Sequence, residues 1–516
     1  MTGSATARLG PPPTALRDKL AQLVFVRIGS NLPPIRTVED DEQRVAGLLE
    51  TCPVGGLLLF NGGAAAKDSL NRLQRMSRVP LLVGADIERG VGQQVTGYTL
   101  FPHAMAFGKL SESEGNAAIG AFAEILAREA SEVGIQITFG PVADVNTNPR
   151  NPIIATRAFG EDPQRVAELV AAYVKVVQSA GLLATAKHFP GHGHTDEDSH
   201  ETLPSVGRSL DELEACEFMP FQAAIDARCA LIMTAHVAYS AVDSSENPAT
   251  LSPAILQKLL RDEMGFAGAV CSDSLLMAGV RERFETEGEM ALAVLQAGVD
   301  LLLDVDDAAA VVDYLCQCVF DDRLAEARVD QALNRLWALK QFASQQVSWQ
   351  EFERIEPEHV ARGAITKTQA ASSTALPLKP DEPLVAILLK PFETPLDPPE
   401  QPLGAALRER FRDVRYRQLG PNADPAAFEA ARQLAQGARQ LLIAVIVRPA
   451  AWHAFGLRPE QSEFVGQLVR SRPVVLASLG VPYVLDDYPE GAVRICGYSD
   501  VPVSQQALAQ FLVTPN

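Results

Sequence analysis

Residues Leu182–His188 read LLATAKH, an apolar run that ends in a lysine and a histidine. Seven further apolar runs occur in the first 305 residues, and polar or charged residues stand at the ends of most of them. The seven are Leu23–Ile28 (LVFVRI), Leu57–Phe60 (LLLF), Leu81–Asp86 (LLVGAD), Ile135–Val142 (IQITFGPV), Leu231–His236 (LIMTAH), Ala269–Asp273 (AVCSD) and Val299–Asp304 (VDLLLD). Runs of this length that are rich in Val, Ile and Leu are typical of strands buried on both faces.

Helical stretches fill the gaps between these eight runs, so the order of elements predicts a (β/α)8 barrel. The chemistry of such barrels lies at the carboxyl ends of the strands, where the loops gather. The residues expected there are Asp86, Asp144, Lys187, His188, His236, Asp273 and Asp304. The pattern therefore predicts both the α/β fold class and the face that carries the active site.

A second alternation of strands and helices begins at Leu384–Leu389 (LVAILL) and predicts a smaller α/β sandwich domain. Its other apolar runs are Leu441–Val447, Val474–Ser478 and Val493–Tyr498, with helix-like segments between them. Helical residues are expected through about Gln369, followed by a linker over Ala370–Pro383 that is rich in Ser, Thr, Pro and Ala. We expect a lead-in over 1–19, the barrel over 20–345, a helical segment and linker over 346–383, and the second domain over 384–516.

The balance of charges disfavours whole classes of partner. Lys and Arg number 45 against 64 Asp and Glu, which gives a net charge of −19. Because phosphate binding needs a basic surface, neither nucleic acid nor an anionic membrane is an expected partner.

The seven cysteines are scattered, and Cys216, Cys229 and Cys271 are expected to be reduced core residues. With no signal-peptide pattern and no apolar stretch of about 20 residues, a cytoplasmic protein is expected.

The densest polar segment is Lys187–His200, which reads KHFPGHGHTDEDSH. Five of the eight histidines lie between His188 and His236. Structural histidines are usually isolated, so this cluster favours a loop over the active-site mouth. The pair His192-Gly-His194 resembles the two-histidine motif of metal-dependent amidohydrolases, but there it stands on the first strand, and zinc needs a third ligand. We therefore expect no metal and no cofactor.

Asp273 ends the seventh strand in the segment Val-Cys-Ser-Asp-Ser-Leu-Leu-Met. A carboxylate held at a strand end inside a barrel mouth is rigid and partly desolvated, which suits a nucleophile that attacks an electrophilic carbon. The alternative interpretation is that Asp273 caps the N-terminus of the following helix.

The strand-five segment Lys-His-Phe-Pro-Gly-His-Gly, followed by Asp198-Ser199-His200, resembles glycoside hydrolase family 3, specifically its β-N-acetylhexosaminidase branch. The resemblance covers most of the chain, and residues 384–512 resemble the α/β sandwich of two-domain members. Further family-like segments are Asp86-Ile-Glu-Arg-Gly90, Pro141-Val-Ala-Asp144-Val, Arg157-Ala-Phe-Gly160-Glu-Asp-Pro163, Met233-Thr-Ala-His236 and Cys271-Ser-Asp273-Ser-Leu.

This resemblance implies a division of labour among the site residues. Asp273 would attack the anomeric carbon, His200 would act as acid and base, and Asp198 would orient His200. Substrate binding would fall to Asp86, Arg157, Lys187, His188 and Met233. The implied activity is a retaining exo-β-N-acetylglucosaminidase that removes terminal β-linked GlcNAc and acts in the recycling of cell-wall muropeptides. The expected partner is a small carbohydrate, and the sequence leaves the oligomeric state open.

One local departure from the family pattern concerns Gln94, which stands where an arginine that contacts the sugar is expected.

On the same scaffold, a β-glucosidase or a retaining phosphorylase is the alternative activity. His200 in place of a second carboxylate would admit anionic acceptors. A metal-dependent amidohydrolase and a non-catalytic carbohydrate-binding barrel are alternatives of other classes. Residues 384–516 show no polar cluster like that of strand five, so we expect them to pack against the barrel without supplying the catalytic acid.

Overall fold

The computed structural model describes residues 9–197, 203–345, 355–369, 376, 378–394, 397–451, 453–488 and 493–514. Of the linker expected at 370–383, residues 370–375 and 377 lie outside the described residues. Within them, no helix combines the length and the apolarity that crossing a membrane requires.

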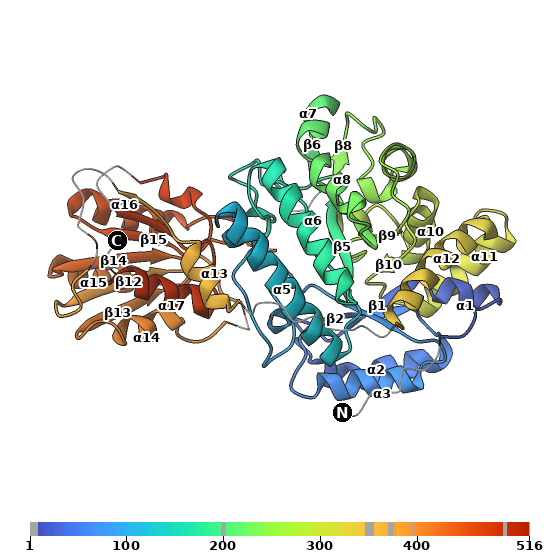
Figure 1. The fold of residues 1–516 in the computed structure, drawn as a ribbon, viewed down its shortest axis with the longest axis horizontal. Helices are drawn as coiled ribbons and strands as arrows, with labels where there is room; N and C mark the ends of the chain where they lie inside the picture. Colours follow the sequence, from blue (N-terminus) through green and yellow to red (C-terminus); the bar gives the residue numbers. More distant parts are fainter. Residues whose placement is uncertain are drawn as a thin grey trace. The chain divides into compact units, whose positions relative to one another are not determined.

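Eight parallel strands form the first sheet (Figure 1), and all eight predicted strands are present in it. They are β1 (Val24–Ile28), β2 (Gly56–Leu59), β3 (Leu82–Ala85), β4 (Ile137–Thr138), β5 (Leu183–Phe189), β7 (Leu231–Thr234), β9 (Ala269–Cys271) and β10 (Leu302–Leu303). Each strand pairs with its neighbour in chain order, and β1 also pairs with β10. A parallel bridge between Cys271 and Leu301 joins β9 to the segment that enters β10, so the sheet closes into the predicted barrel.

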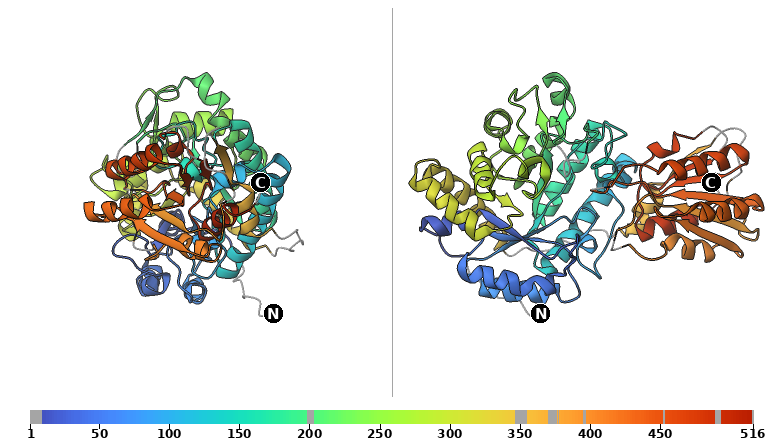
Figure 2. Two further views of the ribbon diagram at one scale, coloured as in Figure 1. Left: turned by 90° about the vertical axis from the view of Figure 1, so that its left-hand side faces the viewer. Right: turned by 180° about the vertical axis from the view of Figure 1, so that it is seen from behind.

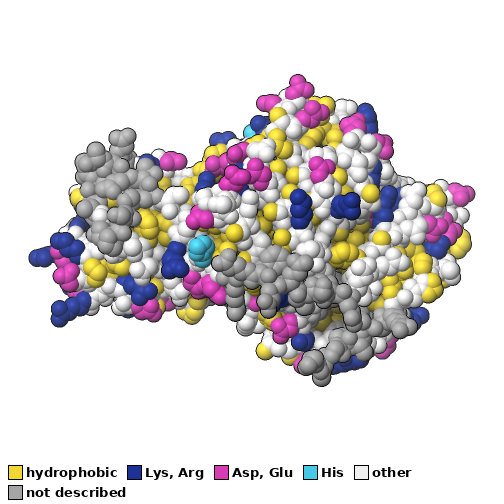
Figure 3. All heavy atoms as spheres, in the orientation of Figure 1, with side chains coloured by type: hydrophobic (Ala, Val, Ile, Leu, Met, Phe, Trp, Pro, Cys, Tyr) yellow, Lys and Arg dark blue, Asp and Glu magenta, His cyan; other side chains and the backbone are white. Residues whose placement is uncertain are grey.

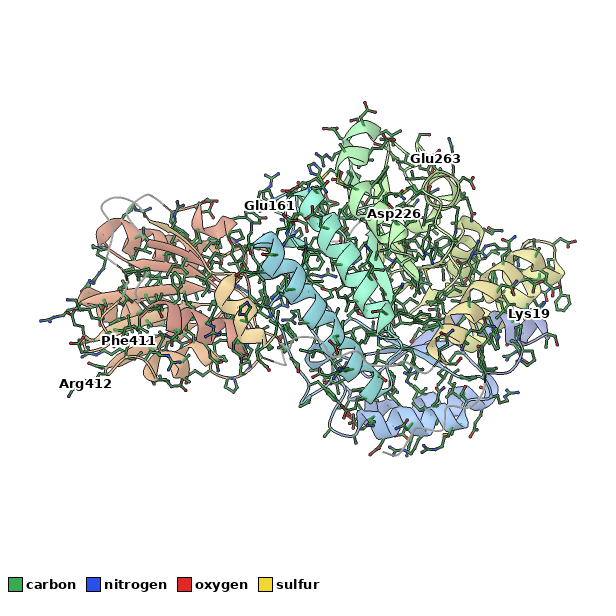
Figure 4. All side chains as sticks on the ribbon, viewed as in Figure 1. Lys19, Glu161, Asp226, Glu263, Phe411 and Arg412 are labelled. Atoms are coloured by element: carbon green, nitrogen blue, oxygen red, sulfur yellow. The ribbon has the colours of Figure 1, made fainter. Side chains whose placement is uncertain are left out.

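Helices alternate with these strands as predicted, and α2 and α3 lie side by side (Figure 1). Lys19 of α1 pairs with Glu326 and Asp330 of α12 at 2.9 and 2.7 Å, which links the first helix to the last helix of this part (Figure 4). The helices through α12 are α1 (Leu16–Ala21), α2 (Val38–Thr51), α3 (Ala66–Met76), η1 (Val91–Gln93), α4 (Ala104–Gly108), α5 (Glu112–Val133), η2 (Ala155–Arg157), α6 (Pro163–Ser179), α7 (Leu210–Ala215), α8 (Phe218–Asp226), η3 (Ala249–Leu251), η4 (Ala254–Glu263), α9 (Ala278–Arg281), α10 (Glu287–Ala297), α11 (Ala308–Phe320) and α12 (Glu326–Ala343). A small parallel pair, β6 (Ser205–Val206) with β8 (Ala238–Tyr239), accompanies the barrel.

The second sheet has the strand order β11-β16-β15-β14-β12-β13, in which only β11 is antiparallel to its neighbour. Helix α16 lies on one side of this sheet, and α14 and α17 lie on the other (Figures 1 and 2). Leu407 of α14 and Leu508 of α17 are fully buried in one apolar cluster with Leu388 of β12. The elements are α13 (Pro357–Gly363), β11 (Thr366–Gln369), β12 (Leu384–Leu389), α14 (Pro402–Arg408), β13 (Val414–Leu419), α15 (Pro425–Gln436), β14 (Gln440–Val445), α16 (Pro459–Ser471), β15 (Val475–Ser478), η5 (Tyr483–Leu485), β16 (Val493–Cys496) and α17 (Pro502–Phe511).

Two of these strands differ from the sequence-based expectation. Thr366–Gln369 were expected to be helical but form strand β11, because the helix before them ends at Gly363 and their backbone pairs with β16. Val414–Leu419, in a region expected to be helix-like, form the edge strand β13. Its sequence VRYRQL alternates between half-buried and exposed side chains, as an edge strand with one covered face does. Before it, Phe411 is buried while Arg412 is exposed (Figure 4).

The chain divides into two compact units whose bounds interleave along the sequence. The first unit holds the described residues within Met1–Leu100, Ile119–Asn148 and Glu161–Glu353, which include all eight barrel strands. The second unit holds those within Phe101–Ala118, Pro149–Gly160 and Arg354–Asn516, which include the second sheet.

On the face that Figure 3 shows, Lys and Arg side chains are scattered among Asp and Glu. Cys216, Cys229 and Cys271 are buried free thiols, as predicted.

Candidate active site

Asp273 follows β9 by two residues, at the carboxyl end of the barrel strands. Its Oδ1 accepts a hydrogen bond from the Ser274 N–H at 2.7 Å, and its Oδ2 lies 4.0 Å from His188 Nε2. Burial raises the pKa of this carboxyl, but its electrostatic interactions with His188, His236 and Lys187 outweigh burial and lower the pKa to about 2. Asp273 is therefore an anion at neutral pH. The capping interpretation is wrong, because the next helix, α9, begins only at Ala278.

The backbone after Asp273 is held by polar contacts that join four barrel strands at their carboxyl ends. Ser274 Oγ donates to Asp304 Oδ2 at 2.6 Å, and Arg27 Nε donates to Asp304 Oδ1 at 3.0 Å. On the other side, His236 Nε2 donates to the Ser274 carbonyl at 3.0 Å, while His236 Nδ1 lies 2.7 Å from Thr250 Oγ1. These contacts fix the segment after β9 that presents the Asp273 carboxylate.

Lys187, on β5, places its ammonium group between two carboxylates from the end of β3. Its Nζ lies 2.6 Å from Asp86 Oδ1 and 2.7 Å from Glu88 Oε1. Lys187 is almost fully buried, whereas Asp86 keeps 30% of its side chain exposed. The Asp86 carboxylate is thus oriented by a buried cation and remains able to accept hydrogen bonds from a ligand hydroxyl.

His188, the next residue, points its two ring nitrogens at different carboxylates. Its Nδ1 donates to Asp144 Oδ2 at 2.7 Å, while its Nε2 is the atom near Asp273. The His192 N–H also donates to Asp144, at 2.7 Å from Oδ1. The structure thus brings Asp86, Lys187, His188 and Asp273 into one site in the barrel.

Of the remaining predicted site residues, two belong to the described structure and two do not. Met233 is buried within β7, and Arg157 belongs to the second unit, where its Nη1 donates to the Ile153 carbonyl at 2.9 Å. Their contacts with substrate stay predictions. Asp198 and His200 lie outside the described residues, and the acid/base pair stays a prediction.

Gln94, which stands where the family pattern has an arginine, is engaged by the scaffold. Its Nε2 donates to the Asp86 carbonyl at 3.1 Å, and its Oε1 accepts from Asn31 Nδ2 at 3.1 Å. The side chain therefore ties the end of β3 to the loop after β1. A carboxamide engaged in this way supports the position of Asp86.

The two histidines of the amidohydrolase-like motif have different partners. His192 Nδ1 lies 2.8 Å from Thr195 Oγ1, whereas His194 Nδ1 lies 2.9 Å from Thr147 Oγ1. Within the described ranges, no group of three or more His, Cys, Asp or Glu side chains is arranged to hold a metal ion.

Sequence reasoning assigned no role to Glu88, Asp144 or His236, although all three lie in the segments that it identified. Glu88 follows Asp86 by two residues, and this spacing was the available signal for a second carboxylate on the same lysine. Asp144 and His236 were recognised only as strand ends, because their contacts with His188 and Ser274 join residues 44 and 38 positions apart in the sequence.

Comparisons with known proteins agree with this geometry. The family model described as the glycosyl hydrolase family 3 N-terminal domain matches residues 15–339. Beta-hexosaminidase A of Pseudoalteromonas piscicida is 30% identical over 383 residues, which cover 66% of this chain and 63% of that protein. Beta-hexosaminidase of Idiomarina loihiensis is 33% identical over 343 residues, which cover 65% of this chain and 97% of that protein. The chain thus spans just under two thirds of the former and nearly all of the latter.

A solved structure extends the likeness to the second unit. The glycoside hydrolase family 3 beta-N-acetylglucosaminidase from Paenibacillus sp. str. FPU-7 has a TM-score of 0.84 to this structure at 28% identity, and the match covers 97% of both chains. The closed barrel with Asp273 at its carboxyl face, the second α/β sheet and these matches agree: the chain belongs to glycoside hydrolase family 3.

Proposed function

We propose that this protein is a retaining exo-β-N-acetylglucosaminidase that removes terminal β-linked GlcNAc from small glycosides. The observation that carries the proposal is the ionised Asp273, whose pKa is lowered to about 2 and whose Oδ2 lies 4.0 Å from His188 Nε2. An anionic carboxylate held near basic side chains at the carboxyl face of a barrel is suited to attack an anomeric carbon. Two relatives named beta-hexosaminidase and the beta-N-acetylglucosaminidase structure from Paenibacillus support the choice of sugar.

In the proposed mechanism, Asp86, Lys187 and His188 hold the sugar hydroxyls while Asp273 forms a covalent glycosyl-enzyme. Arg157 and Met233 complete the substrate contacts, and His200, oriented by Asp198, protonates the leaving oxygen and then activates the acceptor. Muropeptide fragments of the cell wall are the proposed natural substrates.

The nucleophile is tested with Asp273→Asn, which keeps the shape of the side chain and removes its charge. We expect turnover of nitrophenyl β-GlcNAc to fall by at least about 1,000-fold, because a carboxamide is a poor nucleophile. The matched control is Asp262→Asn at an exposed position of η4, which should leave turnover unchanged. A slow 2-fluoro-type substrate should label Asp273, and labelling of another carboxylate would refute the assignment.

The activity itself is tested with nitrophenyl β-GlcNAc, β-glucoside and β-GalNAc, each with and without phosphate. The proposal expects fastest release from β-GlcNAc with water as the acceptor. Faster release from the β-glucoside would indicate a glucosidase, and formation of a sugar phosphate would indicate a phosphorylase. Loss of all activity after chelation, with recovery on adding a metal, would favour the amidohydrolase alternative.

A further inference from the structure

Asp144 is a fully buried carboxylate that the proposed mechanism does not use. It lies at the end of the fourth strand segment, and donors from two other residues converge on it. His188 Nδ1 lies 2.7 Å from Oδ2, and the His192 N–H lies 2.7 Å from Oδ1. The backbone N–H of His188 lies 3.2 and 3.3 Å from the two oxygens. A buried carboxylate that is satisfied this fully is rigid and can orient the groups that donate to it.

We propose that Asp144 is a positioning residue that sets the tautomer and the direction of the His188 ring, an inference that rests on the proposed function. A carboxylate only accepts hydrogen bonds, so Nδ1 must carry a proton. Nε2 is then the nitrogen left for the sugar and Asp273, whose Oδ2 is 4.0 Å away. Asp144 decides which nitrogen of His188 faces the reacting carboxylate, as the orienting carboxylate does for the histidine of a serine hydrolase.

The same carboxylate also holds the start of the loop that follows β5. Oδ1 binds the His192 N–H, and Gly193 lies so close to the Val145 carbonyl that an added Cβ would stand 1.8 Å from its oxygen. In sequence, this loop continues to Asp198 and His200. One side chain therefore fixes both the sugar-facing histidine and the root of the segment that carries the proposed acid/base pair.

Asp144→Asn separates the orientation of the His188 ring from the anchoring of the loop at His192, because the carboxamide keeps one oxygen and loses the other. That oxygen can still accept from the His192 N–H, whereas the amide nitrogen replaces Oδ2 and donates to His188 Nδ1. The ring must then move its proton to Nε2, which reverses the hydrogen-bonding character presented to the sugar. We expect kcat/KM on nitrophenyl β-GlcNAc to fall at least about 10-fold, since an orienting hydrogen bond to a charged partner is lost.

A double-mutant cycle tests whether the effect passes through His188. If it does, Asp144→Asn introduced into a His188→Ala background should change kcat/KM by less than about 2-fold, because the ring to be oriented is absent. A loss as large as in the native background would overturn the proposal. The matched control is Asp41→Asn, another buried carboxylate that accepts a backbone N–H, from Gly29 at 3.1 Å. It should lower stability and leave kcat/KM unchanged.

Nitrogen-15 NMR of the histidine-labelled native protein gives a readout that does not depend on activity. The His188 signals, assigned by their loss in His188→Ala or by scalar couplings, should show a protonated Nδ1 in the native protein. An unprotonated Nδ1 would overturn the proposal. A native protein with protonated Nδ1 that does not cleave aryl GlcNAc would instead contradict the proposed function and support the positioning role of Asp144. In Asp144→Asn, the proton should appear on Nε2 alone.

Discussion

At the scale of single residues, the charge of Asp273 depends on basic side chains supplied by other strands. Burial alone would raise the pKa of this carboxyl, and His188, His236 and Lys187 reverse that effect. Because the pKa in the folded protein, about 2, lies below the ordinary value of 3.8, the ionised carboxylate stabilises the fold above pH 3.8. That stabilisation is lost as the pH falls through 2. The proposed nucleophilic role of Asp273 and its contribution to stability therefore depend on the same three neighbouring side chains.

This arrangement predicts a pH dependence for Lys187→Met. Removing the ammonium group raises the pKa of Asp273, so the acid limb of kcat/KM attributable to Asp273 should move to higher pH. Profiles of kcat/KM against pH for nitrophenyl β-GlcNAc measure the shift. Lys19→Met, which breaks ion pairs on α1 and α12 outside the site, is the control and should keep the native profile. Identical acid limbs in all three proteins would contradict the charge assignment.

The proposed acid/base role of His200 predicts a dependence on the leaving group. His200→Ala should slow substrates with poor leaving groups far more than activated aryl glycosides, because an activated phenolate needs little protonation. Rates for a series of aryl β-GlcNAc substrates, plotted against the pKa of the released phenol, measure this slope. Equal losses across the series would point to a structural role for His200.

At the scale of elements, the segment after β5 is held by close backbone packing. Gly193 lies against the Val145 carbonyl, and the Tyr239 hydroxyl donates to the Gly191 carbonyl at 2.6 Å. Gly191 has a φ of +136°, and an added Cβ there would stand 2.7 Å from the Glu217 Cβ. The segment leading to the proposed acid/base pair therefore tolerates no side chain at these two positions.

Gly193→Ala tests this packing. The added methyl group must push the loop away from Val145, and we expect a loss of about 1–3 kcal/mol in the free energy of unfolding, together with reduced turnover. Gly207→Ala is the matched control, because nothing lies within 4 Å of a Cβ at that position. Urea unfolding and aryl GlcNAc kinetics measure both effects. Equal behaviour of the two variants would show that the loop adjusts without cost.

At the scale of the whole molecule, the second unit includes two segments that the chain inserts between barrel strands. Phe101–Ala118 and Pro149–Gly160 both belong to it. His103 Nδ1 lies 2.8 Å from Ser499 Oγ, and the Lys109 ammonium lies 5.5 Å from the centre of the Tyr498 ring. Removing the C-terminal part would thus take partners away from residues that precede β4 in the sequence.

Truncation after Gln345 tests what the C-terminal part contributes. Every residue with a proposed chemical role precedes Gln345, so a soluble truncated protein should keep measurable hydrolysis of aryl GlcNAc. Its stability should fall, because His103 and Lys109 lose their partners. His103→Ala in the full chain isolates one such contact and should cost about 1–3 kcal/mol. A truncated protein that is folded by circular dichroism yet inert would show that the C-terminal part supplies an essential group.

Local sequence determined the barrel and the face of its site. A strand buried on both faces must be apolar along its length, so all eight runs were recognisable, and a polar residue at the end of a run faces the mouth in any parallel barrel. That reasoning placed Asp86, Lys187, His188 and Asp273 together. It missed β13, because a strand buried on one face alternates apolar and polar residues instead of forming a run.

Only the tertiary structure decided how the polar ends meet. Lys187 pairs with carboxylates that lie about 100 positions earlier, and His188 is oriented by Asp144 across two neighbouring strands. These pairings depend on strand register and on side-chain directions, which arise when the sheet closes. A strand-end aspartate reads the same in sequence whether it attacks a sugar, as proposed for Asp273, or orients a histidine, as proposed for Asp144. Their different neighbours in the folded barrel distinguish them, because hydrogen bonding and charge act over a few ångströms of space.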